Sequence, residues 1–182
     1  DNPEHKAHRI VDPEEKKILE EVLASPGDFS VTQTNRNKTE KPPLSFDLTS
    51  LQSEANKMWS WSAKRTLGVA QELYATHKLT TYPRTDSRFL PEDMMEEISK
   101  TIRKLGAQDS LNEHSQRLID NGLSNSSRNF DNAKVADHFA IIPTGKIPQD
   151  NLSADVSRLY DLISRQFLAS FHPAASWDVQ RR

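Results

Sequence analysis

Tyr82 and Arg84 lie two residues apart and are the pair in this sequence best suited to attack a phosphodiester. Pro83 between them fixes its own backbone and favours an extended conformation at Tyr82, and residues two apart in an extended chain point to the same side. A phenol becomes a nucleophile when a cation stabilises the phenolate, and an arginine binds phosphate oxygens with its planar fork. The pair therefore indicates phosphoryl transfer, with the guanidinium placed where charge develops on the attacked phosphate. Taken alone, residues 79–87 also fit a strand-to-turn connection with a half-buried tyrosine.

Two further clusters could take part in the same chemistry. His138 precedes the apolar run 140–142 and could hold a phosphate or transfer a proton, although a packed histidine beside a strand is an alternative. Lys64 and Arg65 follow Ser62 at an expected helix start, and a helix N-terminus with basic residues is a ready phosphate site. The alternative for this second cluster is an ordinary capped surface helix.

The composition limits the function classes. The chain has 182 residues, no Cys, and a net charge of −2, which argues against a freestanding nucleic-acid binder and against thiolate metal sites or disulfides. Between Lys57 and Arg88, however, six Lys and Arg stand against two Asp and Glu, so a basic segment surrounds the Tyr82 motif. Neither a transmembrane run nor a signal peptide is visible, which predicts a cytoplasmic location and no membrane partner. With 35% hydrophobic residues the core is thin, as expected of a piece of a larger protein.

The pattern of caps, apolar stripes and turn residues predicts a mainly α fold with short β-strands. Helices are expected from Pro13 to the turn at Pro26-Gly27, over about 50–59 behind a capping box at Thr49, over 63–77, from Pro91 to Gly106, over 111–120, and from Ser153 to Phe171. Strands are expected over 29–36, 78–82 and 176–179, with a linker over 37–43 and a loop over 124–129.

Four of these helices carry apolar stripes that we expect to be buried. In the helix over 63–77 the apolar face consists of Thr66, Leu67, Ala70, Leu73 and Tyr74, opposite Lys64, Gly68, Gln71 and Glu72. The stripe of the first is Ile18, Leu19, Val22 and Leu23; that of the helix after Pro91 is Met94, Met95, Ile98, Ile102 and Leu105; that of the last is Val156, Leu159, Tyr160, Ile163, Phe167 and Leu168.

A set of motifs that occurs in a fixed order indicates a protein family more specifically than any single motif does. They are Phe46-Asp47-Leu48-Thr49-Ser50-Leu51-Gln52, Ser62-Ala63-Lys64-Arg65-Thr66-Leu67 with Ala70-Gln71-Glu72-Leu73-Tyr74, Thr81-Tyr82-Pro83-Arg84-Thr85-Asp86-Ser87-Arg88-Phe89-Leu90-Pro91, Asp137-His138-Phe139-Ala140-Ile141-Ile142-Pro143-Thr144, and Leu159-Tyr160-Asp161-Leu162-Ile163 with Phe167-Leu168. Over roughly residues 10–174 this series of motifs resembles the type IA DNA topoisomerases. The proline after the tyrosine and the Ile-Ile-Pro-Thr run are most similar to the topoisomerase III branch.

The resemblance implies a reaction and a set of site residues. Tyr82 would attack the DNA backbone and become joined to the 5′ phosphate of a broken single strand, Arg84 would position that phosphate, and His138 would contact DNA near the site. The candidate DNA-binding residues are Lys64, Arg65, Gln71, Asp86, Ser87, Lys134 and Thr144. The expected partner is DNA, preferentially single-stranded, and the expected setting is a bacterial nucleoid or a plasmid.

The resemblance also implies a domain arrangement and a cofactor. A helical tyrosine domain over 44–171 would be inserted in a β-rich arch, of which 1–43 and 172–182 would be pieces. The family binds Mg²⁺ through a Toprim domain with an Asp-x-Asp motif, which this sequence lacks, so we expect no metal ligands here. The chain by itself is expected to be an inactive fragment.

Two other functions share features with this pattern. A non-catalytic DNA-binding or assembly module could retain the same pattern, and only loss of covalent chemistry in a Tyr82 variant separates it from an enzyme. A tyrosine recombinase would group several Arg and His around a tyrosine near the chain end, which is not the arrangement of this sequence.

Overall fold

The computed structural model describes residues 12–24, 32–123, 126–148 and 151–181, and it divides the chain into two compact units. One unit is Lys38–Trp177; the other comprises Asp1–Asn37 and Asp178–Arg182. The limits expected for the tyrosine domain, 44 and 171, lie a few residues inside the first of these, which is called the helical unit below. The chain is mainly helical with one small sheet, as the sequence predicted.

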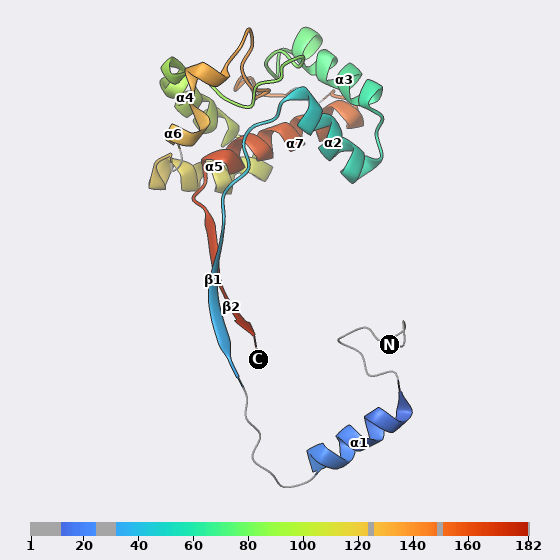
Figure 1. Cartoon of the computed structure of the whole chain (residues 1–182). Helices are drawn as coiled ribbons and strands as arrows, with labels where there is room; N and C mark the ends of the chain where they lie inside the picture. Colours follow the sequence, from blue (N-terminus) through green and yellow to red (C-terminus); the bar gives the residue numbers. More distant parts are fainter. Residues whose placement is uncertain (1–11, 25–31, 124–125, 149–150, 182) are drawn as a thin grey trace. The chain divides into compact units, whose positions relative to one another are not determined.

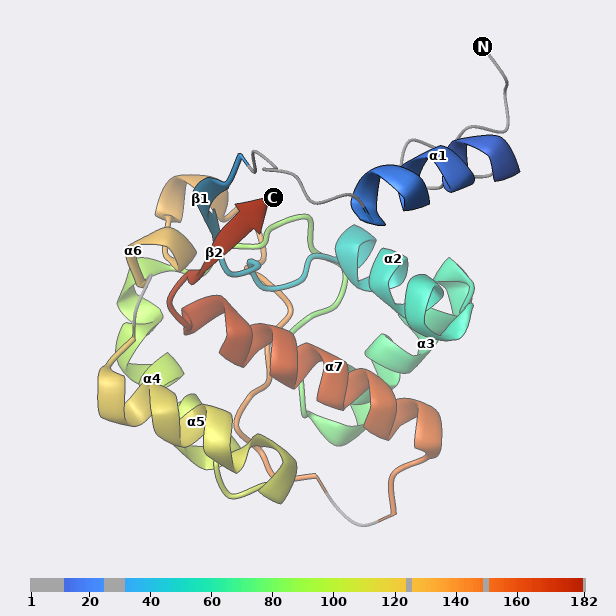
Figure 2. The same ribbon diagram turned by 90° about the horizontal axis from the view of Figure 1, so that it is seen from below.

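The helical unit is built around its last helix, α7. In Figure 2, α7 crosses the unit, with α2 and α3 to one side and α4 and α5 to the other. The predicted apolar stripe of α7 is confirmed, because all six residues are buried. Ser153 caps α7 by accepting a hydrogen bond from Val156 N at 3.3 Å. The helices are α2 (Leu48–Trp59), α3 (Ala63–Glu72), α4 (Met95–Leu105), α5 (Asp109–Asn121), α6 (Ser126–Asn129) and α7 (Ala154–Phe171), with a π-helical turn at Leu73–His77 and 3₁₀ turns at Glu92–Met94 and Asn132–Lys134.

Several local expectations for the helical unit need correction. The capping box of α2 is formed by Asp47 and Ser50 rather than at Thr49, since the Asp47 carboxylate accepts from Ser50 N at 2.6 Å and Ser50 Oγ accepts from Asp47 N at 3.2 Å. Met95 is 45% exposed, because the chain opens this helix with a 3₁₀ turn that displaces Met95 from the buried stripe. The loop expected over 124–129 contains the short helix α6.

The predicted first helix is present as α1 (Pro13–Ala24), and it begins as expected, with Asp12 Oδ1 accepting from Glu14 N at 2.8 Å. The prediction that its apolar stripe is buried is wrong. Ile18, Leu19, Val22 and Leu23 are 40–68% exposed, because no described residue packs over them.

Among the described residues, β1 (Thr34–Glu40) pairs with β2 (Ala175–Arg181) in a two-stranded sheet (Figure 1). Every residue of both strands is exposed. The predicted strand 176–179 is confirmed within β2. The strand expected over 29–36 is found only from Thr34 onward, and residues 29–31 lie outside the described residues. The linker expected over 37–43 was wrong up to Glu40, because pairing with the distant β2 gives this polar segment partners that its own sequence does not reveal.

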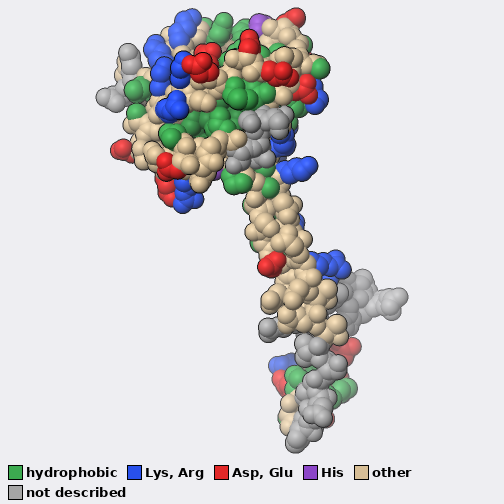
Figure 3. All heavy atoms as spheres, turned by 90° about the vertical axis from the view of Figure 1, so that its left-hand side faces the viewer, with side chains coloured by type: hydrophobic (Ala, Val, Ile, Leu, Met, Phe, Trp, Pro, Cys, Tyr) green, Lys and Arg blue, Asp and Glu red, His purple; other side chains and the backbone are tan. Residues whose placement is uncertain are grey.

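On the face of the helical unit seen in Figure 3, basic and acidic side chains both surround exposed hydrophobic ones. No helix among the described residues is long and apolar enough to cross a membrane.

Candidate active site

The segment that carries Tyr82 is extended but does not form a regular strand. Thr80 makes a single bridge to Pro143, Thr81 N donates to Ile142 O at 3.0 Å, and Thr144 N donates to Leu79 O at 2.9 Å. Pro83 and Pro143 have no N–H to extend this ladder, so the strand expected over 78–82 is reduced to isolated bridges.

Two threonine hydroxyls tie this segment to the segment that carries His138. Thr81 Oγ1 donates to Ala140 O and accepts from Ile142 N, both at 2.9 Å. Thr85 Oγ1 donates to His138 O at 3.0 Å and accepts from Ser87 N. Since both threonines are shielded at least in part from water, the backbones on either side of Tyr82 and His138 are held in one register.

Tyr82 lies half-buried between two aromatic rings. Its ring centroid is 4.4 Å from that of His138, with an interplanar angle of 46°, and 5.4 Å from that of Tyr74 in an edge-on arrangement. His138 itself is exposed, so the histidine is not the packed core residue that the alternative interpretation required. The structure thus brings the exposed imidazole of His138 into contact with the Tyr82 ring, although the two residues lie far apart in the sequence.

Arg84 is exposed and is held by Gln71 at the end of α3. With the Gln71 amide oriented so that its oxygen faces the guanidinium, this oxygen accepts from Arg84 Nη2 at 2.9 Å and from Nε at 3.0 Å. A neutral acceptor orients the guanidinium and leaves its charge uncompensated, so the remaining N–H groups can bind an anion. Gln71 was predicted as a DNA contact; its position also gives it a role in orienting Arg84.

The π-helical turn Leu73–His77 sets the direction of Tyr74. Sequence periodicity placed Tyr74 on the buried face of the helix, whereas it is 38% exposed and turned to Tyr82. A π-turn adds a residue to a helical turn, which rotates the side chains that follow, and such turns are frequent at functional sites. Lys78 ends the turn in the left-handed conformation, with φ 57°, and its Nζ lies 5.6 Å from the Tyr74 ring centroid.

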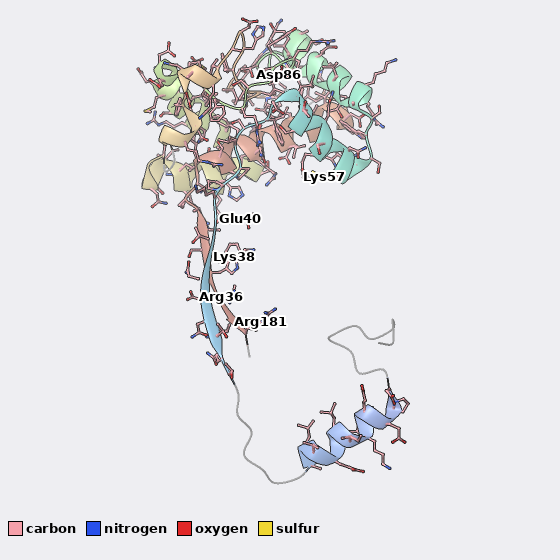
Figure 4. All side chains as sticks on the ribbon, in the orientation of Figure 1. Arg36, Lys38, Glu40, Lys57, Asp86 and Arg181 are labelled. Atoms are coloured by element: carbon pink, nitrogen blue, oxygen red, sulfur yellow. The ribbon has the colours of Figure 1, made fainter. Side chains whose placement is uncertain are left out.

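The other predicted site residues lie at varying depths around this centre. Asp86 is exposed at the surface of the helical unit (Figure 4). Ser87 is buried, and its hydroxyl donates to Lys134 O at 2.8 Å, so in this structure it orders the loop. Lys134 is exposed but its Nζ pairs with Asp131 at 2.6 Å, and the exposed Thr144 donates its hydroxyl to Lys78 O.

Lys64 and Arg65 lie at the opposite end of α3 from Gln71, about 10 Å away by the rise of an α-helix. Ser62 caps this helix as predicted, accepting from Arg65 N at 3.2 Å. Both side chains are exposed, but Arg65 pairs with Asp155 at 2.7 Å and stacks over Trp61. Of the two cations, Lys64 is the one that extends freely to solvent.

Sequence reasoning missed Tyr74, Lys78 and Phe139 as site residues. Together with Thr80, Thr81, Tyr82 and Thr144 they line an open hollow of about 330 Å³ beside the phenol. Phe139 follows His138 directly and could have been found by adjacency, but the sequence holds no signal for the π-turn that brings Tyr74 to the site.

The described residues do not contain a group of three or more His, Cys, Asp or Glu that could hold a metal ion. The residues of this site therefore do not fit Mg²⁺, and no step below is routed through a metal.

Comparisons with known proteins indicate one protein family. A family model described as DNA topoisomerase matches residues 1–182. DNA topoisomerase 3 of Shouchella clausii is 39% identical over 180 residues, and that of Bacillus subtilis is 41% identical over 137 residues; these matches cover 96% and 75% of this chain. The full-length topoisomerase I of Thermotoga maritima, a solved structure, is similar over 100% of the chain with a TM-score of 0.60 and 26% identity. The chain spans 24% of the Shouchella protein, 19% of the Bacillus protein and 28% of the Thermotoga protein.

Proposed function

The chain belongs to the DNA topoisomerase family, and from this premise we propose that it carries the nucleophile of an enzyme that cleaves and reseals one DNA strand. The observation that carries the proposal is the grouping of Tyr82 with His138 at 4.4 Å and the neighbouring, outward Arg84 oriented by Gln71. A phenol, an imidazole and a guanidinium at one exposed point suit attack on a phosphodiester.

In the proposed reaction the Tyr82 phenolic oxygen bonds to phosphorus as the bond from phosphorus to the 3′ oxygen breaks. The 5′ phosphate stays on the tyrosine. The phenol gives up its proton as it attacks, and the freed 3′ oxygen takes up one proton to become a hydroxyl, so the step is balanced. The reverse step reseals the strand. Because the ester bond is exchanged rather than hydrolysed, strand passage and resealing need no ATP for this chemistry.

Arg84 and His138 have different parts in this proposal. The Arg84 guanidinium would bind the non-bridging oxygens, where negative charge grows in the transition state. His138 would contact DNA and hold the phenol in place through the ring contact. Gln71 would act through Arg84 as a positioning residue.

The proposed DNA path continues from this centre to the cations around it. Lys64 would bind a backbone phosphate, and Thr144 would contact the strand beside Tyr82. Lys134 and Arg65 would bind phosphates only by releasing Asp131 and Asp155. Asp86 and Ser87 remain DNA-binding predictions, although the inward Ser87 hydroxyl favours an indirect role.

The remaining parts of the proposal concern the rest of the protein. Mg²⁺ would be bound by a Toprim domain, where it would supply positive charge, and the 182-residue chain alone would be inactive. The domain limits 44 and 171, a preference for single-stranded DNA, and action in the bacterial cytoplasm belong to the same proposal.

The test is Tyr82→Phe in the full-length enzyme, read as the covalent protein–DNA adduct trapped by denaturation. We expect loss of the adduct with DNA binding retained, because the phenylalanine keeps the ring contacts but has no nucleophile. Tyr160→Phe is the matched control, since it makes the same change at a buried tyrosine of α7. An adduct that persists in Tyr82→Phe would refute the nucleophile, and the non-catalytic DNA-binding module would then be favoured.

A further inference from the structure

The hollow beside Tyr82 is apolar, although it lies at a site that must meet a highly charged substrate. Two of its walls are the rings of Tyr74 and Phe139, and a third is Tyr82 itself. Its volume of about 330 Å³ lies within the range of small-molecule sites. Aromatic walls bind a charged phosphate poorly, so the hollow is suited to a flat, uncharged group that is attached to a phosphate.

The polar groups of the hollow are few and carry no negative charge. The exposed Lys78 lies beside the Tyr74 ring, so its ammonium group can pair with a backbone phosphate while the hollow binds an apolar group. Thr80, which is 2% exposed, has a hydroxyl without a hydrogen-bond partner among the described residues. This hydroxyl is itself buried, so recognition of a group in the open hollow would depend on the aromatic rings and on Lys78.

The backbone around the hollow is irregular. The π-helical turn brings Tyr74 edge-on to Tyr82, and Lys78 is held in a left-handed conformation that is uncommon outside glycine and asparagine. Strained conformations and π-turns persist where the surroundings fix them and cluster at ligand sites. Here they act on the same two side chains, Tyr74 and Lys78, that line the hollow.

We propose that this hollow binds the nucleobase of the nucleotide joined to the phosphate that Tyr82 attacks, on the side that stays attached to the protein. The base would stack on Tyr74 and Phe139, and its backbone would pass Lys78. Stacking of bases on aromatic side chains tolerates any sequence, because every base has a π-face. The site would therefore hold the cleaved end in place without selecting a sequence. This inference rests on the proposed function.

The test uses full-length enzyme carrying Tyr82→Phe, which binds without cleaving, and single-stranded oligonucleotides with one abasic position moved along the cleavage site. We expect one position, next to the scissile phosphate on its 5′-phosphate side, at which loss of the base weakens binding about fivefold or more. In a Tyr74→Ala background the same abasic position should cost little further affinity, whereas Tyr74→Phe should keep the full sensitivity. Trp177→Ala is the matched control, since Trp177 on β2 is as exposed as Tyr74 (39% and 38%).

The outcomes separate the inference from the function on which it rests. If no abasic position depends on Tyr74 while the wild-type adduct still requires Tyr82, the nucleobase site is refuted and the proposed function stands. If Tyr74→Ala lowers relaxation but not binding of any oligonucleotide, the hollow receives another part of the protein and the inference is wrong. If the adduct survives Tyr82→Phe, the proposed function itself fails. Thermal unfolding of the Tyr74 variants, followed by circular dichroism, checks that they fold.

Discussion

Two helices of this protein carry the same sequence signals and differ in what surrounds them. Both α1 and α7 begin behind a capping side chain and show an apolar stripe. The stripe of α7 is buried among α3, α5 and α6, whereas the stripe of α1 is 40–68% exposed, and β1 and β2 are exposed at every residue. The helical unit therefore contains its own core, while the flanking elements have surfaces that no described residue covers.

The largest difference is expected for truncation of a core side chain in the two regions. Phe167→Ala removes a fully buried ring that packs edge-on against Phe171 at 5.3 Å, and the free energy of unfolding should fall by about 3–5 kcal/mol. Val179→Ala in β2, where the side chain is 41% exposed, should change it by less than about 0.5 kcal/mol. Urea unfolding of the 182-residue chain measures both. Similar losses of unfolding free energy in the two variants would show that the β1–β2 sheet and the helical unit share one core.

The contrast also shows how far the sequence predicts the fold. Periodicity and caps locate α7 and α1 equally well, because both signals are local. Burial of a stripe requires a partner surface, and only a three-dimensional arrangement supplies it. For the same reason β1 was mistaken in part for a linker, since residues 37–40 are polar and become a strand only through the distant β2.

The candidate site likewise has features that follow from local sequence and features that depend on the three-dimensional arrangement. The spacing of Tyr82 and Arg84 was readable because extended backbone has a fixed period. The contact of Tyr82 with His138 joins segments about fifty residues apart, and only the resemblance to a known family pointed to it. Tyr74 was assigned to the wrong face because periodicity assumes an α-helix throughout, and the π-turn at Leu73–His77 breaks that assumption.

Removal of a helix cap should also destabilise the helical unit but not the region of α1, and the change in unfolding free energy should be smaller than for Phe167→Ala. Asp47→Ala removes the carboxylate that accepts from Ser50 N at 2.6 Å, and we expect a loss of about 1 kcal/mol in the free energy of unfolding. Asp12→Ala removes an equivalent bond at the start of α1, yet the cooperative transition should not move, because α1 contributes no buried surface. The two transitions are compared in urea, followed by circular dichroism. A shift with Asp12→Ala equal to that with Asp47→Ala would mean that α1 unfolds together with the helical unit.

The smallest expected effect is a pH dependence that belongs to the helical unit alone. Burial lowers the pKa of His172 from 6.5, and the neighbouring His114 and Arg117 of α5 lower it further. Because the unfolded chain then binds more protons than the folded one, the stabilisation is complete above pH 6.5 and is lost as the pH falls through the lowered pKa of the folded state.

His172→Gln should flatten the dependence of the urea midpoint on pH below 6.5, since glutamine cannot take up the proton. Carboxylates with a lowered pKa, such as Asp131 beside Lys134, take up protons below about pH 5, so the slopes are compared between pH 5 and 6.5. Persistence of the full slope would therefore show that the junction of α7 with β2 is open to water, and that the core of the helical unit ends before His172.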